Sequence, residues 1–136
     1  KIFYSGVSDE RFKKKIKNYV ENATDLLNQI QICSFEYKSY SELINYLRRT
    51  SLVSKSLENE ARKLPYLEGK ASVGAIAQHV KKIFPSCVNG SDDTVYSINW
   101  VNLIPYIIKS IQDLDTKLTD VKNRLKTVEK LLAPGP

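Results

Sequence analysis

The 136-residue sequence has no methionine, one histidine, one tryptophan and two cysteines. The histidine, His79, has no cysteine or carboxylate at ligand spacing, so neither a zinc site nor a serine–histidine pair is predicted. Lys70 lies between Gly69 and Gly74, whereas a phosphate-binding loop places its lysine after the second glycine. We therefore expect the protein to have no enzymatic activity, no metal site and no cofactor.

Long apolar runs are also missing. No stretch is long enough to cross a bilayer, and no signal peptide is present. Because the sequence starts at Lys1, we interpret it as a processed or trimmed piece from which any signal has been removed. A hydrophobic content of 42% supports one domain over residues 1–136, with a flexible lead-in at 1–7 and a flexible tail at 133–136.

The strongest periodic pattern lies in the last third of the chain. Alternating steps of four and three residues meet only apolar side chains: Trp100, Ile104, Ile107, Ile111, Leu114, Leu118, Val121, Leu125, Val128 and Leu132. The pattern predicts a helix about 45–50 Å long, against which other elements lie. We favour an intramolecular bundle seam for this stripe, since other amphipathic helices are predicted. The alternative is a dimeric coiled coil.

Three further helices are predicted upstream. The first covers about residues 9–32, with Ser8 as its N-cap. The second begins at Ser39 or Ser41 and ends before Pro65, and its weakened stripe at residues 48–51 indicates a bend or break. The third runs from Ser72 to Phe84.

A polar loop at residues 85–96 precedes the long helix. That helix begins after Ser97 or Asn102, and the earlier start would place Pro105 inside it as a kink. No strand-like alternation of any length is present. The expected fold is therefore all-α: a single compact bundle of four to five helices with a long C-terminal helix.

Two features favour a secreted, disulfide-bonded protein. Cys33 and Cys87 each follow a predicted helix, and Asn22 and Asn89 each begin a glycosylation sequon. We favour a Cys33–Cys87 disulfide, which would contribute about 4 kcal/mol in the loop-entropy picture. The alternative is a pair of buried free thiols in a cytosolic protein.

The net charge of +6 favours acidic partners. The basic clusters that we consider for partner binding are Lys13, Lys14, Lys17, Arg48, Arg49, Lys81 and Lys82. Eight tyrosines could add contact area at an interface. Basic and aromatic residues do not interleave in a recognisable nucleic-acid motif, so we predict no nucleic-acid partner. The alternative for each cluster is a solvated face.

The chain is small, basic, rich in tyrosine and predicted to be helical, and its opening, Lys1 to Ser8, reads as a mature end left by signal cleavage. In this overall character it resembles the anophensin and albicin group of anopheline mosquito salivary proteins. The resemblance implies a secreted, non-enzymatic inhibitor of host plasma proteins, acting on the alternative-pathway convertase of complement or on the contact system.

Two other functions remain open. One is a secreted helical carrier of a small apolar ligand, which would need a cavity lined by the long helix and the first helix. The other is a coiled-coil assembly module, in which the stripe pairs between chains. Of these three functions, we favour the inhibitor and expect a monomer.

Overall fold

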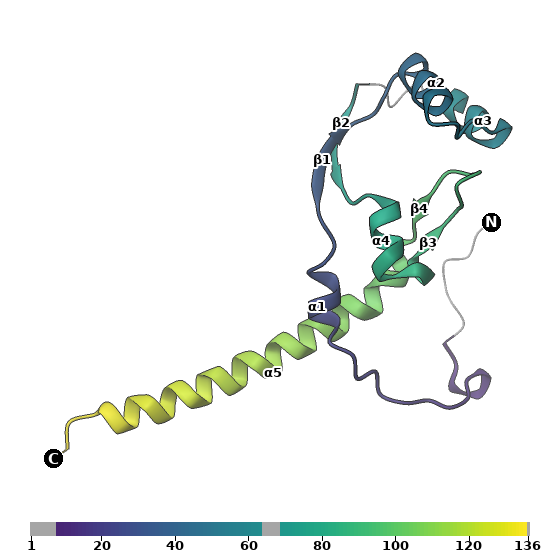
Figure 1. Ribbon diagram of the computed structural model, residues 1–136. Helices are drawn as coiled ribbons and strands as arrows, with labels where there is room; N and C mark the ends of the chain where they lie inside the picture. The colour runs from purple at the N-terminus through teal and green to yellow at the C-terminus, as the bar shows by residue number, and fades with distance from the viewer. Residues whose placement is uncertain (1–7, 64–68, 136) are drawn as a thin grey trace.

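The computed structural model describes residues 8–63 and 69–135. Within them the chain forms five α-helices, two 3-10 turns and two antiparallel two-stranded sheets (Figure 1). In chain order the elements are η1 (Glu10–Phe12), α1 (Ala23–Leu27), β1 (Cys33–Glu36), α2 (Tyr40–Arg49), α3 (Lys55–Lys63), β2 (Ala71–Gly74), α4 (Ala77–Ile83), η3 (Pro85–Cys87), β3 (Val88–Asn89), β4 (Ser97–Ile98) and α5 (Trp100–Leu132).

Helix α5 is the long C-terminal helix that the heptad pattern predicts. Its cap is neither Ser97 nor Asn102 but Asn99, whose side-chain oxygen accepts a hydrogen bond from the Asn102 amide at 3.3 Å. Pro105 lies inside the helix. The C-terminal half of α5 stands away from the other elements, with no part of the chain beside it (Figure 1). No helix in the described ranges is long and apolar enough to cross a membrane.

The core lies around the first turns of α5. Val80 of α4, Phe84 just after it, Cys87, Val88 and Leu103 form one buried cluster. Tyr106 of α5 packs on it, with its ring centroid 4.7 Å from that of Phe84. Helix α1 packs against α5 one turn further along, where the buried hydroxyls of Thr24 and Ser110 hydrogen bond at 2.9 Å.

Helices α2 and α3 form a separate hairpin with its own buried residues, Ile44, Leu47 and Ala61. The β1–β2 ribbon joins this hairpin to the rest of the chain (Figure 1). The predicted break in the second helix is confirmed, because α2 ends at Arg49 and α3 begins at Lys55. Ser39 caps α2 in a capping box with Glu42. Pro65, predicted to end this helix, lies outside the described residues.

The predicted helix over residues 9–32 is wrong. Only η1 and the five-residue α1 are helical there, and the chain between them has no regular structure (Figure 1). An amphipathic helix of this length depends on packing of its apolar face. Here Phe12 and Ile16 remain 78% and 62% exposed, and lysines occupy positions 13, 14, 15 and 17. Without a packed face, nothing offsets the repulsion among neighbouring lysines.

The all-α prediction is also wrong. β1 and β2 pair antiparallel, with Cys33 opposite Gly74 and Glu36 opposite Ala71, and β3 pairs with β4. The start of the predicted third helix, Ser72 to Gly74, is in β2. These two-residue and four-residue strands are too short to show alternation in the sequence. The compact bundle is equally incorrect, since α1 and the core cluster pack on the first turns of α5 and leave the rest of its length uncovered (Figure 1).

The predicted disulfide does not form, and both cysteines are free. Cys33 begins β1 and does not follow a helix, and its thiol donates to the Gly74 carbonyl at 3.5 Å. Cys87 is fully buried in the core cluster. Helix ends that were expected to meet do not exist, because the first predicted helix is mostly absent.

Candidate functional site

The apolar stripe of α5 is the largest candidate interaction surface. Every one of its ten residues is exposed, from 43% at Ile107 to 78% at Leu132. Exposed apolar residues are common when scattered, but a continuous row of them indicates an interaction site. The preference for an intramolecular bundle seam is therefore wrong for this stripe.

The chain's own contacts with α5 explain why the stripe stays open. Leu103, 1% exposed, and Ser110, 8% exposed, are seven residues apart and lie on one side of the helix. The core cluster and α1 cover this side. Of the stripe residues at the same height, Ile104 and Ile111 lie about a quarter turn around the helix from this side, and Ile107 lies at its border. All three remain 43–62% exposed.

The stripe changes in width along the helix. Near its start, Val101 and Ile108 lie beside the stripe and are 48% and 51% exposed, which widens the apolar surface. In the C-terminal half the flanking positions are charged, as at Asp115, Lys122 and Glu129. The apolar surface is therefore wide at the start of α5 and narrow, with charged flanks, in its C-terminal half. The two ends of the helix thus present different surfaces.

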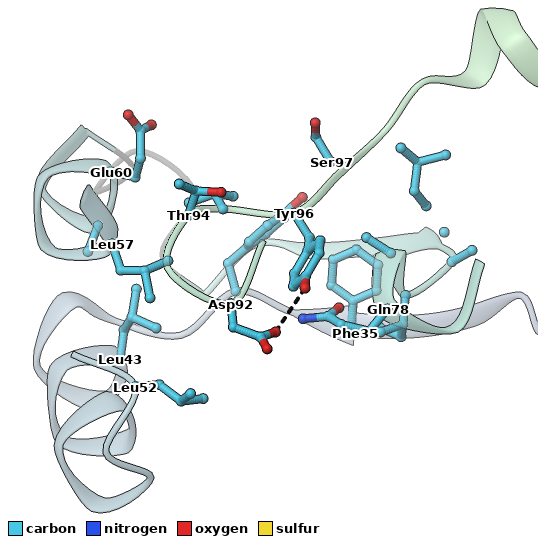
Figure 2. Close-up of a pocket in the computed structure, with 18 of the residues that line it drawn as sticks. Phe35, Leu43, Leu52, Leu57, Glu60, Gln78, Asp92, Thr94, Tyr96 and Ser97 are labelled. Atoms are coloured by element: carbon cyan, nitrogen blue, oxygen red, sulfur yellow. Dashed lines mark hydrogen bonds between the residues drawn. The ribbon is translucent and has the colours of Figure 1, made fainter. Parts of the chain in front are cut away.

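A groove of about 600 Å³ lies between the α2–α3 hairpin and the loop that joins β3 to β4. In Figure 2, Leu43, Leu52 and Leu57 lie near the loop that carries Asp92, Thr94 and Tyr96. The Tyr96 hydroxyl donates to Asp92 at 2.8 Å (Figure 2), and the Ser54 hydroxyl donates to the Asp93 carbonyl at 2.7 Å. These bonds hold the loop beside the hairpin.

A third feature is a serine–lysine pair near the start of the described chain. The Lys13 ammonium lies 2.9 Å from the Ser8 hydroxyl oxygen. Asp9 accepts hydrogen bonds from Arg11 at 2.6–3.1 Å, and this contact lowers the pKa of Asp9 and raises that of Arg11. From the sequence, Ser8 was expected only to cap a helix. A serine five residues before a lysine is too common a spacing to have indicated this contact.

The basic residues predicted for partner binding do not form one surface. Lys13, Lys14 and Lys17 lie in the irregular segment after η1, whereas Arg48 and Arg49 end α2. On α4, the Lys81 ammonium lies 4.7 Å from the Tyr96 ring centroid, and Lys82 is exposed. Their role in partner binding stays a prediction.

The two sequons lie in different settings. Asn22 is the N-cap of α1, and its side chain both accepts from the Asp25 amide and donates to the Asp25 carboxylate at 2.6 Å. A glycan would remove that donor. Asn89 is exposed in β3. Across residues 8–63 and 69–135, no three His, Cys, Asp or Glu side chains gather where they could hold a metal ion.

Part of the chain matches a known protein family. Residues 8–89 match a family described as "Chaperone of endosialidase", which also bears a peptidase name. The match covers more than half of the 136 residues, so the chain belongs to this family. It includes the Ser8–Lys13 pair and the α2–α3 hairpin, and it ends before β4 and α5. No curated protein matches the sequence.

Proposed function

We propose that this chain is an assembly module that joins copies of itself through the stripe of α5. In this proposal it acts as a chaperone, as the family description says, by holding the polypeptides that associate with it side by side. The observation that carries the proposal is the exposure of all ten stripe residues. A coiled-coil assembly module is one of the two alternatives to the inhibitor that the sequence leaves open.

The total surface supports the same proposal. The chain exposes 11357 Å², whereas a compact monomer of 15.5 kDa is expected to expose about 7,200 Å². Stable interfaces bury roughly 1,200–2,000 Å² in total. The excess surface is therefore large enough to supply such an interface, which argues against the monomer expected from the sequence.

The residues of the stripe favour three or more helices over two. The pairs three residues apart define heptad positions a and d: Ile104 with Ile107, Ile111 with Leu114, Leu118 with Val121, and Leu125 with Val128. Dimers favour a β-branched residue at a and leucine at d, which only the second pair provides. Isoleucine at both positions, as in the first pair, or leucine at a with isoleucine at d favours trimers and tetramers. The last two pairs have leucine at a and valine, which is β-branched like isoleucine, at d.

A parallel arrangement fits the change in width along α5. In parallel helices the wide apolar starts around Val101 and Ile108 meet one another, and the charged C-terminal halves meet one another. An antiparallel arrangement would place those apolar residues against Lys122 and Glu129 and bury charge against apolar surface.

The test is the mass in solution. Analytical ultracentrifugation of the full chain should give three or more times 15.5 kDa, and Leu118→Asp should give a monomer with unchanged circular dichroism of the core region. Lys117→Asp, next to it but off the stripe, is the matched control and should remain assembled. A monomeric wild-type chain at high concentration would exclude the proposal.

A second candidate function is supported by the Ser8–Lys13 contact and by the peptidase name of the family. In it, the Ser8 hydroxyl oxygen attacks a peptide carbonyl while the Lys13 amine takes its proton. The carbon–nitrogen bond then breaks, the departing amine receives that proton, and water hydrolyses the ester. The expectation that the chain is not an enzyme stays a prediction, and this contact argues against it.

Cleavage is tested by intact-mass spectrometry of a chain carrying additional residues before Lys1. A new fragment should appear with the wild-type sequence and be lost in Ser8→Ala and Lys13→Met. Lys14→Met, which changes the neighbouring lysine, should still give the fragment. Absence of any cleavage in the assembled wild-type protein would exclude this function.

The inhibitor of host plasma proteins remains an untested prediction. The family match does not bear on complement, the contact system or secretion. The apolar-carrier function required a cavity lined by α5 and the first predicted helix. A hollow of about 420 Å³ does lie there, lined by Tyr19, Tyr106 and Lys109 among others, but the predicted first helix that was to cover it is not formed. We therefore place both below assembly.

A further inference from the structure

We propose that the groove beside the α2–α3 hairpin binds residues 12–20 of a second copy of this chain. This segment is called the N-terminal arm below. The inference rests on the proposed self-assembly through α5. It identifies a second segment, outside the stripe, through which neighbouring copies contact one another.

The groove has an unusual lining for a basic protein. Its residues are mainly apolar, including Phe35, Leu43 and Val95. Among the residues that the structure describes, the charged side chains that line it are Glu60 and Asp92, without a lysine, arginine or histidine, although the chain carries a net charge of +6. Glu60 also pairs with the exposed Lys63 at 2.6 Å, outside the groove lining. Such a groove fits an apolar segment that also carries positive charge.

The N-terminal arm has the complementary composition. Its apolar residues Phe12, Ile16 and Val20 recur every four residues and are 78%, 62% and 88% exposed. Four lysines lie between them, at positions 13, 14, 15 and 17. These apolar side chains are not covered by their own chain, and the cations would lie near the two groove carboxylates.

The arm's contact with its own chain is near its end. There the Tyr19 ring packs edge-on against Tyr106, with centroids 5.6 Å apart. From the region of α1, the arm runs below α1 and the α2–α3 hairpin lies above it (Figure 1). The arm therefore leads away from the groove of its own chain, which favours a groove on a neighbour.

The groove and the α5 stripe are continuous through Trp100. This residue is the first position of the stripe and also lines the groove, and it is 50% exposed. Copies that associate along the stripe would therefore bring a neighbouring chain beside the groove. The arm is the exposed apolar segment of that neighbour with matching charge.

The first test is disulfide trapping between two differently sized copies. Both carry Cys33→Ala, and Cys87 is retained because it is fully buried. A tagged chain with Ile16→Cys is unfolded and refolded with an untagged chain carrying Leu52→Cys, which lines the groove. Mild oxidation should give the mixed dimer at several times the yield of a control in which the tagged chain carries Ile32→Cys in place of Ile16→Cys. Ile32 is 61% exposed and lies outside the groove.

Two results would overturn the inference. One is a mixed-dimer yield no greater than that of the Ile32→Cys control. The other is a disulfide within single chains that carry both Ile16→Cys and Leu52→Cys, because the arm would then occupy its own groove. Ultracentrifugation of the same samples separates the two proposals: assembled chains without trapping contradict only the arm, whereas monomeric chains contradict assembly as well.

The second test addresses charge. Glu60→Lys should lower the trapping yield several-fold without changing the assembled mass, because a cation in the groove repels the arm lysines. Glu58→Lys, on the same helix but outside the groove lining, is the matched control and should leave the yield unchanged. Equal yields for the two variants would show that the groove carboxylate does not contact the arm.

Discussion

The side-chain oxygens of Thr24 and Ser110 lie 2.9 Å apart, although 86 residues separate them in the sequence. Each residue is only 8% exposed. This contact places α1 on the side of α5 that also carries Leu103. It therefore determines which side of the long helix is covered and leaves the apolar stripe open to other chains.

Thr24→Val should lower the free energy of unfolding by about 1–3 kcal/mol, because it leaves the Ser110 hydroxyl buried without its partner. Urea unfolding followed by circular dichroism measures the change. Thr116→Val is the control, since the Thr116 hydroxyl bonds only the Gln112 carbonyl within α5 and is exposed. An equal loss in both variants would mean that the change reflects valine in a helix and not the contact between α1 and α5.

Gly90→Ala should destabilise the β3–β4 hairpin by about 1–3 kcal/mol. Gly90 has a φ of +101°, and an added Cβ would lie 2.4 Å from the Val95 carbonyl oxygen. The loop that carries Asp92 would have to shift, so thermal stability and trapping at the groove should fall together. Gly135→Ala, whose Cβ would meet nothing within 4 Å, should change neither quantity.

The capping box of α2 predicts a pH dependence. The Ser39 backbone amide donates to the Glu42 carboxylate, and this bond, with that to the Ser39 hydroxyl, lowers the pKa of Glu42 from its usual 4.5. A carboxyl group whose pKa is lower in the folded chain stabilises the fold above its unfolded value. That contribution is lost as the pH falls through the folded pKa.

Glu42→Gln removes this titration while keeping an acceptor at the same position. The melting temperature of the wild type should therefore fall more than that of the variant between pH 6 and pH 3. Glu129→Gln near the end of α5 serves as the control and should follow the wild type. A variant that loses as much stability as the wild type over this range would contradict the role of the Glu42 carboxylate.

Assembly through α5 also predicts a concentration dependence. If copies bind one another only when folded, the melting temperature rises with protein concentration by mass action. We expect this rise in the wild type and no rise in Val121→Asp, which places a charge in the stripe. Asn123→Asp, which adds the same charge on the side of α5 away from the stripe, should keep the dependence. A melting temperature independent of concentration in the wild type would contradict assembly.

Local sequence signals predicted several elements correctly. The heptad stripe located α5, because a regular apolar repeat over ten positions is specific to a helix. Ser39 with Glu42 three residues later located the start of α2, since each side chain satisfies the other residue's backbone amide. The weak stripe at residues 48–51 located the break before α3. Each of these signals depends on neighbours a few residues away.

Other features depended on contacts that local signals do not contain. Residues 12–19 have helical spacing, yet no surface of their own chain covers Phe12 and Ile16, so the segment stays extended. The short β1–β2 ribbon requires Cys33 and Gly74 to meet across the α2–α3 hairpin. The Ser8–Lys13 contact depends on side-chain positions around η1 that the five-residue spacing does not fix.

The sequence by itself determined that residues 100–132 form one long helix with a continuous apolar stripe. Apolar residues that recur three and four positions apart lie on the same face of an α-helix. Only the tertiary structure decided that this face is open. The buried pair Thr24 and Ser110 and the buried Leu103 bring α1 and the core cluster to a different side of α5. Periodicity defines a face of a helix, but packing of distant segments decides what covers it.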